Sequence, residues 1–268
     1  MAELTPTVRP AAVAGRFYPG RPDALVEMID AMLTPVDVPE DDELCPAYVV
    51  PHAGYRFSGP TAGHVYARLR AHAQHIRRVL LIGPAHFVRM RGCAVPAAEH
   101  WDTPLGEVPV DTAGRDALVG SGHAVANDEP HAPEHALEVQ LPFLQRVLAP
   151  GVPVLPVAAG PSTVDAVADL LAAGSADGTV LLCSTDLSHY HDDRTARELD
   201  AATIGAVTDR APDRIGTRDA CGVFGLRGLT ALAARLDWTP RLLDYSTSAD
   251  TAGTPDRVVG YAAFAVGP

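Results

Sequence analysis

Three histidines, His52, His86 and His189, each follow a short apolar run, and they are the first residues in the chain that suggest chemistry. Each run is typical of a buried strand, and each ends near small or turn-forming residues that let the backbone turn and approach a ligand. Imidazole is the commonest metal ligand in proteins and titrates near neutral pH. If the strands are neighbours, these side chains converge on one metal or catalytic site.

A thiol and a carboxylate extend this set. Cys221 and Gly222 are expected to open a helix, and a helix N-terminus lowers the pKa of a thiol and favours the thiolate that metals and nucleophilic reactions need. A small buried residue at a helix start is the alternative interpretation of Cys221. Asp186 follows the same apolar run as His189 and adds a carboxylate at that strand end.

His135 and Glu138 are three residues apart on a predicted helix and would share one face. A histidine beside a carboxylate can act as a general base or can orient metal ligands. An exposed histidine among acidic residues at a helix N-terminus is an equally good interpretation. Glu134 and His135 begin like a zincin motif, but no second histidine stands at position 139, so a zincin is not expected.

Alternating strands and helices must position these side chains. Apolar periodicity predicts helices over 22–33, 60–69, 134–148, 193–207 and 222–236, and strands over 47–50, 79–82, 153–157, 180–183, 241–245 and 258–265. The pattern predicts an α/β fold, a single domain over 1–268 with a mixed, mostly parallel central sheet and helices on both faces. The last two strands have no helix between them and are expected to pair as an antiparallel edge of the sheet. In such sheets ligands bind beyond the carboxyl ends of the strands.

Composition excludes several classes of function. The 268 residues include 21 Arg but no Lys, which removes Schiff-base and ordinary pyridoxal phosphate chemistry and the standard P-loop. The net charge of −12 argues against nucleic acid as a partner. No apolar run has the length of a membrane span, and residues 1–20 lack a signal-peptide pattern, so a cytoplasmic protein with four free thiols is expected.

Several strings along nearly the whole chain resemble the Memo-like family, called AmmeMemoRadiSam system protein B in prokaryotes. These strings occur in the family's order: Val13-Ala14-Gly15-Arg16-Phe17-Tyr18-Pro19, Pro51-His52-Ala53-Gly54-Tyr55 with Ser58-Gly59, Gly83-Pro84-Ala85-His86, Trp101-Asp102-Thr103-Pro104-Leu105-Gly106, Glu134-His135-Ala136-Leu137-Glu138 with Leu141-Pro142, Ser184-Thr185-Asp186-Leu187-Ser188-His189, and Cys221-Gly222.

The family is similar in fold to class III extradiol dioxygenases, which open catechol rings with non-haem Fe(II). The resemblance implies a metal held by His52, His86 and Cys221, where the dioxygenases have a glutamate in place of the cysteine. It also implies that His189 is the catalytic histidine, with Asp186 beside it. This chain has Gln140 where the family often has a histidine. A thiolate ligand makes copper and zinc competitors of iron.

The expected function is therefore that of a metal-dependent oxidoreductase using Fe(II) or Cu, O₂ and a small bidentate, possibly aromatic substrate. Its expected substrate-binding or supporting residues are Tyr18, Tyr55, His135, Glu138 and Gln140. A zinc-dependent hydrolase with the same ligands is one alternative, and a non-catalytic metal- or peptide-binding protein is another. A cysteine-nucleophile enzyme is a weaker one. The prokaryotic family name suggests a radical-SAM system partner.

Overall fold

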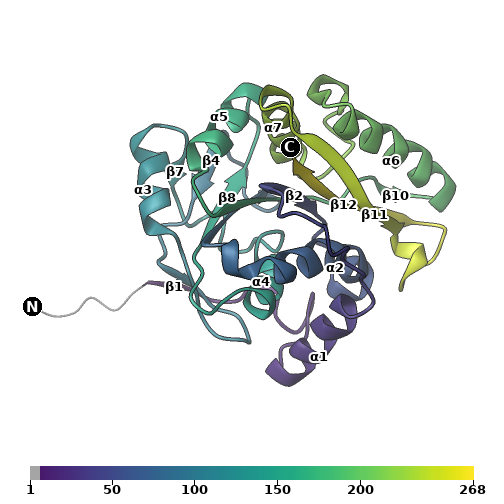
Figure 1. Cartoon of the computed structure of the whole chain (residues 1–268), viewed down its shortest axis with the longest axis horizontal. Coiled ribbons are helices and arrows are strands. Elements are labelled where there is room, and N and C mark those ends of the chain that lie inside the picture. Colours follow the sequence, from purple (N-terminus) through teal and green to yellow (C-terminus); the bar gives the residue numbers. More distant parts are fainter. Residues whose placement is uncertain (1–6) are drawn as a thin grey trace, which may run out of the picture.

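The computed structural model describes residues 7–268, so residues 1–6 of the expected 1–268 domain lie outside the described part. A nine-stranded sheet forms its centre (Figure 1). The strands of the described part are β1 (Val8–Arg9), β2 (Ala47–Val50), β3 (Arg78–Pro84), β4 (Cys93–Val95), β5 (His100–Trp101), β6 (Val108–Pro109), β7 (Val125–Ala126), β8 (Val154–Ala159), β9 (Thr179–Ser184), β10 (His189–His191), β11 (Thr239–Thr247) and β12 (Val258–Gly267).

The middle of this sheet is parallel and its margins are mixed. The order is β10-β12-β2-β9-β3-β8-β4-β7, and β11 also pairs with β12. The neighbours β2, β9, β3 and β8 run parallel, whereas β12 is antiparallel to β2 and β4 is antiparallel to β8. The prediction of a mixed sheet with a mostly parallel centre is confirmed. A separate small sheet of β1, β5 and β6 was not predicted.

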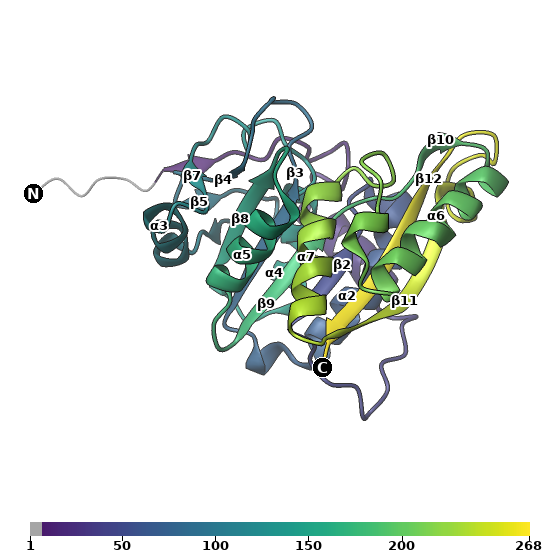
Figure 2. The same cartoon turned by 90° about the horizontal axis from the view of Figure 1, so that it is seen from above.

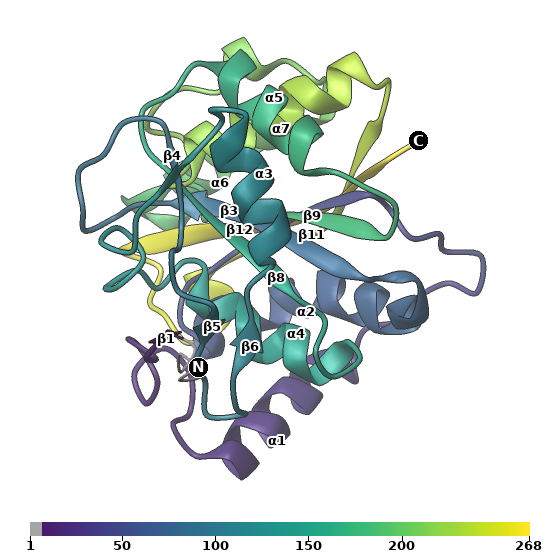
Figure 3. The same cartoon turned by 90° about the vertical axis from the view of Figure 1, so that its left-hand side faces the viewer.

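Helices flank the sheet on both sides (Figures 2 and 3). They are α1 (Pro22–Leu33), α2 (Tyr55–Ala71), α3 (Thr112–Gly120), α4 (Leu141–Val147), α5 (Val164–Gly174), α6 (Asp193–Thr208) and α7 (Val223–Arg235). Side chains of β2 alternate between two cores: Tyr48 and Val50 pack with α1, α2 and α4, and Ala47 and Val49 pack on the side of α5 and α7. Burial of both faces explains why the central strands are continuous apolar runs.

Helix α1 shows how the pattern produces the packing. Its bounds, Pro22–Leu33, agree with the predicted range, and Pro22 occupies the first turn, where its missing N–H costs nothing. Leu25, Ile29 and Leu33 recur every four residues and are fully buried against the α2 and α4 side of the core. Each such side chain contributes about 1.5–3 kcal/mol when it leaves water.

Two predicted helices differ from the observed ones. Helix α2 begins at Tyr55, before the predicted start at residue 60, and contains Pro60 inside it. The proline lacks the N–H that would bond to the fourth preceding carbonyl, and the helix continues without that one bond. The helix predicted over 134–148 is wrong in its first half, which is a turn followed by a short 3₁₀ segment (Glu138–Gln140), with α4 only after it.

The last two strands pair antiparallel, as predicted, with Arg241 opposite Ala265. Strand β12 is not an edge, however, because it also pairs with β2 and with β10. Among the helices of residues 7–268, none is both long and apolar enough to cross a membrane.

Candidate metal centre

The carboxyl ends of β2, β9 and β3 lie side by side and bring three histidines together. The order β2-β9-β3 places the ends of β2 and β3 on either side of β9. His52 follows β2, His86 follows β3, and His135 lies in the turn before α4. One ligand nitrogen from each of these three imidazoles lies within 4.8 Å of the others. The convergence of His52 and His86 agrees with the rule that ligand sites lie at the carboxyl ends of parallel strands. The third histidine of the cluster is His135, whereas His189, which was expected there, lines the same cavity without belonging to the cluster.

Hydrogen bonds set the tautomer of His52. The Ser184 hydroxyl donates its proton to the Ala136 carbonyl at 2.7 Å, so its oxygen accepts from His52 Nδ1 at 2.9 Å. His52 Nδ1 therefore carries the hydrogen, and its Nε2 lone pair points toward the cluster. Burial, followed by the nearby charge of His86, lowers the pKa of His52 to about 3, which keeps the ring neutral at physiological pH. A neutral imidazole with a free lone pair is the form that binds a metal.

Gln140 supports this arrangement from behind. Its Nε2 donates to Ser184 Oγ at 2.9 Å and to the Pro51 carbonyl at 3.0 Å, and its Oε1 accepts from the Tyr66 hydroxyl at 2.6 Å. The amide is buried and does not line the cavity at the site. Gln140 thus acts on the site by holding Ser184, which in turn orients His52.

Glu134 organises the other two imidazoles. Its Oε1 accepts from His86 Nδ1 at 2.9 Å and from the backbone N–H groups of His135 and Ala136, and its Oε2 accepts from the His86 backbone N–H at 2.6 Å. These bonds draw the chain into a turn at His135, which explains why the predicted helix does not form here. Because an ionised carboxylate only accepts, the His86 proton sits on Nδ1 and its Nε2 is free.

The charge state of Glu134 results from two opposed effects. Burial raises the pKa of this carboxyl, but the hydrogen bond and charge of His86 and the backbone N–H groups outweigh it and lower the pKa to about 2. Glu134 is therefore an anion with no exposed surface. Glu134 is not among the site residues expected from the sequence, although its position directly before His135 is a usable signal. Carboxylates that fix a metal-binding histidine in this way raise its basicity.

His135 completes the imidazole cluster. Its ring stacks on that of His86, with centroids 4.7 Å apart and planes at 16°. Burial, followed by the charge of His52, lowers the pKa of His135 to about 4. Its Nδ1 is buried and has no hydrogen-bond partner within residues 7–268, although Glu134 Oε1 lies 3.3 Å away. His135 Nδ1 is thus buried beside the Glu134 carboxylate.

Cys221 also contacts His52. Its Sγ is 3.1 Å from His52 Nε2 and accepts the Asp186 backbone N–H at 3.2 Å. Gly222 permits this approach, because a Cβ at that position would lie 2.7 Å from the Ser184 carbonyl oxygen. A lowered thiol pKa was expected from the helix start. Instead, burial and the charge of Asp186 raise the pKa of Cys221, so the sulfur is a neutral thiol unless a cation is nearby.

His189 and Asp186 complete the polar lining of the same cavity. His189 Nδ1 donates to the Leu187 carbonyl at 2.7 Å, which leaves Nε2 as the basic nitrogen. Asp186 Oδ1 accepts the His52 backbone N–H at 2.7 Å, and burial raises the pKa of this carboxyl. The backbone carbonyl of Leu187, not Asp186, thus orients His189, while Asp186 braces the strand end that carries His52.

Three other candidates from the sequence lie away from the cavity. Glu138 is fully buried and accepts from Arg9 at 2.6 Å, from the Tyr18 hydroxyl at 2.6 Å and from two backbone N–H groups of residues 12–13. The Tyr55 hydroxyl donates to the Val139 carbonyl at 2.6 Å. None of Tyr18, Tyr55 and Glu138 lines the cavity, so these groups fasten the N-terminal segment and α2 to the turn that carries His135.

The cluster of three histidines could hold a metal ion. The cavity has a volume of about 820 Å³ and is lined by the three clustered histidines together with Asp186, His189 and Cys221. Metal–nitrogen and metal–sulfur bonds of about 2.1 and 2.3 Å place two adjacent ligands about 3.1 Å apart at a right angle and about 3.6 Å apart in a tetrahedron. The distance between His52 Nε2 and Cys221 Sγ, 3.1 Å, matches such a pair at a right angle, but the three ligand atoms that lie within 4.8 Å of one another belong to His52, His86 and His135 and not to Cys221.

The fold and the site define an α/β protein with a histidine-rich cluster at the carboxyl ends of its parallel strands. The family model described as Memo-like protein matches residues 9–265, and the chain belongs to this family. It is 36% identical to a MEMO1 family protein of Methanopyrus kandleri over 96% of this chain and 98% of that protein. It is 34% identical to a MEMO1 family protein of Methanosarcina mazei, with 97% and 99% covered.

Proposed function

We propose that the protein is a metal-dependent oxidoreductase that acts on O₂ and a small bidentate substrate, as extradiol dioxygenases do. The supporting observation is the paired arrangement of His52 and His86, whose Nδ1 protons are engaged by Ser184 and Glu134, so that their Nε2 lone pairs remain for a ligand; in the structure the Cys221 thiol contacts that of His52. His135 is the residue that completes a group of three ligand atoms within 4.8 Å of one another, whereas Cys221, which contacts His52 at 3.1 Å, would be the third ligand expected from the sequence. Ligands on one side leave positions open toward the cavity.

A redox-active metal such as Fe(II) or Cu, when bound, supplies the electron transfer that O₂ needs before it reacts with an organic substrate. His189 has the protein's proton-transfer role. Its Nδ1 contacts the Leu187 carbonyl, so in the neutral ring the lone pair lies on Nε2, which can take a proton from a substrate hydroxyl and later return it. The rings of Phe17 and Tyr261 line the same cavity.

The first test is metal content after anaerobic loading. Wild-type protein is expected to bind about one Fe or Cu per chain, and His52→Ala and His86→Ala are expected to lose it. His75→Ala is the matched control, because His75 is exposed in the short 3₁₀ segment before β3, at the opposite end of that strand from His86. Wild-type protein that binds no metal after reconstitution would remove the basis of the proposal.

A second measurement decides between Cys221 and His135. Co(II) bound to a thiolate gives an intense sulfur-to-metal charge-transfer band in the near ultraviolet. This band is expected in wild type and in His135→Ala and is expected to be absent in Cys221→Ala. A Co(II) complex without the band in wild type, and with affinity lost in His135→Ala, would assign the three imidazoles as the ligands instead.

Activity then separates the reaction classes. The Fe(II)-loaded protein is expected to consume O₂ with a catechol- or aminophenol-like substrate, and His189→Ala is expected to retain metal and lose the consumption. Hydrolysis with Zn(II) under strictly anaerobic conditions would select a zinc hydrolase. Metal binding without turnover of any compound across a broad panel would leave a binding protein.

A further inference from the structure

Two arginines line the cavity beside the histidine cluster. Arg56 belongs to the first turn of α2, and Arg257 directly precedes β12. Asp186 is the one carboxylate among the lining residues, and it is buried at the His52 end. The chain as a whole carries a net charge of −12, so this cavity differs in charge from the rest of the molecule.

Neither guanidinium is used by the fold. Within residues 7–268, the Arg56 and Arg257 side chains form no ion pair and donate no hydrogen bond. Each instead lies over an aromatic ring: Arg56 is 4.4 Å from the centroid of Phe57, and Arg257 is 4.4 Å from that of Tyr190. Stacking restricts the plane of a guanidinium but leaves its N–H donors available for a ligand.

The position of Arg56 is unfavourable for the helix by itself. The N-terminus of α2 carries the positive end of the helix dipole, the first turn has no acidic residue, and Gly54 provides no side-chain cap. A cation placed there adds positive charge to positive charge. An anion bound at the same place would be favoured both by the helix and by the arginine.

Arg257 belongs to the loop between β11 and β12, which is hydrogen-bonded to the first turn of α2. The Thr251 hydroxyl donates to the Phe57 carbonyl at 3.0 Å, which ties the loop between β11 and β12 to the first turn of α2. Thr254 of this loop also lines the cavity. The two guanidinium groups, although 201 positions apart in sequence (257 − 56), therefore come from hydrogen-bonded neighbouring segments.

We propose that Arg56 and Arg257 bind the carboxylate of an aromatic substrate and orient its ring toward the histidine cluster. The planar fork of a guanidinium matches a carboxylate, and Phe17, Phe57 and Tyr190 supply flat apolar surface for the ring. The cavity volume of about 820 Å³ accommodates such a compound. The aromatic ring of the substrate is taken from the proposed function, so this inference rests on it. Binding of the carboxylate can nevertheless be measured without turnover.

The experiment compares a charged and a neutral ligand of the same shape by calorimetry. The probes are 3,4-dihydroxybenzoate and 3,4-dihydroxybenzamide, titrated into metal-free and metal-loaded protein. Wild type is expected to bind the acid about tenfold or more tightly than the amide, because hydrogen bonds to a charged group are worth that much. Arg56→Gln and Arg257→Gln should each reduce this preference severalfold, and the double variant should abolish it.

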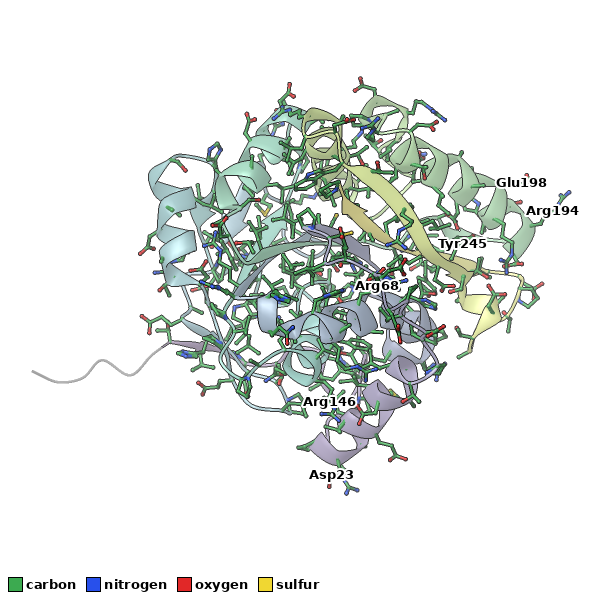
Figure 4. The ribbon with its side chains drawn as sticks, viewed as in Figure 1. Asp23, Arg68, Arg146, Arg194, Glu198 and Tyr245 are labelled. Carbon is green, nitrogen blue, oxygen red and sulfur yellow. The ribbon has the colours of Figure 1, made fainter. Side chains whose placement is uncertain are left out.

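Two further variants make the result specific. Arg194→Gln removes an equal charge from the outer side of α6, where Arg194 is exposed and does not line the cavity (Figure 4), and should leave the preference unchanged. Arg257→Lys keeps the charge but lacks the planar fork, and it should weaken binding of the acid while folding normally, as checked by circular dichroism.

Each outcome has a distinct meaning. Equal affinity for acid and amide, or an equal loss in Arg194→Gln, would overturn the inference while leaving metal binding intact. The protein could fail to bind any metal and still prefer the acid in a way that depends on both arginines. That result would support the anion site and overturn the proposed oxidoreductase. Inorganic phosphate that displaces the acid at lower concentration than benzoate does would overturn the carboxylate assignment and indicate a phosphorylated ligand.

Discussion

Replacement of Glu134 by glutamine tests how far the metal centre depends on one buried carboxylate. The two oxygens of Glu134 accept four N–H groups: three on Oε1, including His86 Nδ1, and one on Oε2. A glutamine has one oxygen and one NH₂, so in either orientation at least one N–H group that is buried or part-buried in the wild type faces a donor. A buried group left without a partner costs about 1–3 kcal/mol, and loss of the charge-assisted bond to His86 adds to this.

The expected loss is about 2–4 kcal/mol of unfolding free energy, which for a chain of this size lowers the Tm by roughly 5–15 °C. Metal affinity should fall about tenfold to a hundredfold, because His86 loses the acceptor that fixes its tautomer. Urea unfolding of metal-free protein and competitive metal titration measure the two quantities. Glu198→Gln, on the exposed side of α6 (Figure 4), is the matched control.

The pH dependence follows from the sign of the pKa shift. The pKa of Glu134 is lowered from its usual 4.5 to about 2, so its ionised form stabilises the folded state fully above about pH 4.5. That contribution is lost as the pH falls from 4.5 toward 2, and the stability difference between wild type and Glu134→Gln should shrink over this interval. A variant that matches wild type in stability and binds metal within twofold would refute this account of Glu134.

Three further predictions concern other parts of the structure. Tyr18→Phe should remove one buried hydrogen bond to Glu138 and lower the unfolding free energy by about 1–2 kcal/mol in urea titrations. Metal affinity should stay unchanged, and a large loss of metal affinity would contradict a purely structural role for Tyr18. Gly222→Ala should displace the Cys221 sulfur and weaken the charge-transfer band of the Co(II) protein, since the new Cβ would overlap backbone; an unaltered spectrum would oppose the assigned geometry. His131 is buried, and burial followed by the charge of Arg9 lowers its pKa from 6.5 to about 4. Because protons then bind the unfolded chain preferentially, about 3 kcal/mol of unfolding free energy should be lost as the pH falls from 6.5 to 4. His131→Phe should show a flatter pH profile in the same unfolding assay, and a profile parallel to that of wild type would count against the shift.

Much of the site geometry can be deduced from local sequence. The apolar runs before His52 and His86 predict buried strands, and neighbouring parallel strands bring the residues after their carboxyl ends to one edge of the sheet. The observed order β2-β9-β3 satisfies that condition. The same reasoning could not give the strand order itself, because pairing across 100 or more residues is not encoded in any local pattern.

The features that could not be predicted from the sequence all depend on distant partners. The turn at His135 forms because Glu134 bonds to His86, a residue 48 positions earlier, and helical periodicity over 134–148 contains no trace of that contact. Likewise, the high thiol pKa of Cys221 results from burial against β9 and Asp186, which a helix-start argument does not include. Arg56 and Arg257 share a cavity only after the fold joins two exposed segments.

The place of β12 in the sheet has a consequence for synthesis of the protein. Its residues, Val258–Gly267, pair with β2, β10 and β11, all of which precede it in the chain. Until the ribosome has released this segment, β2 presents an unpaired edge of apolar residues, and such edges invite pairing with other chains. Because β12 is made after the other strands of the sheet, the nascent protein passes through a stage in which the sheet is open at β2, and holdase chaperones that cover strand edges should bind it at that stage.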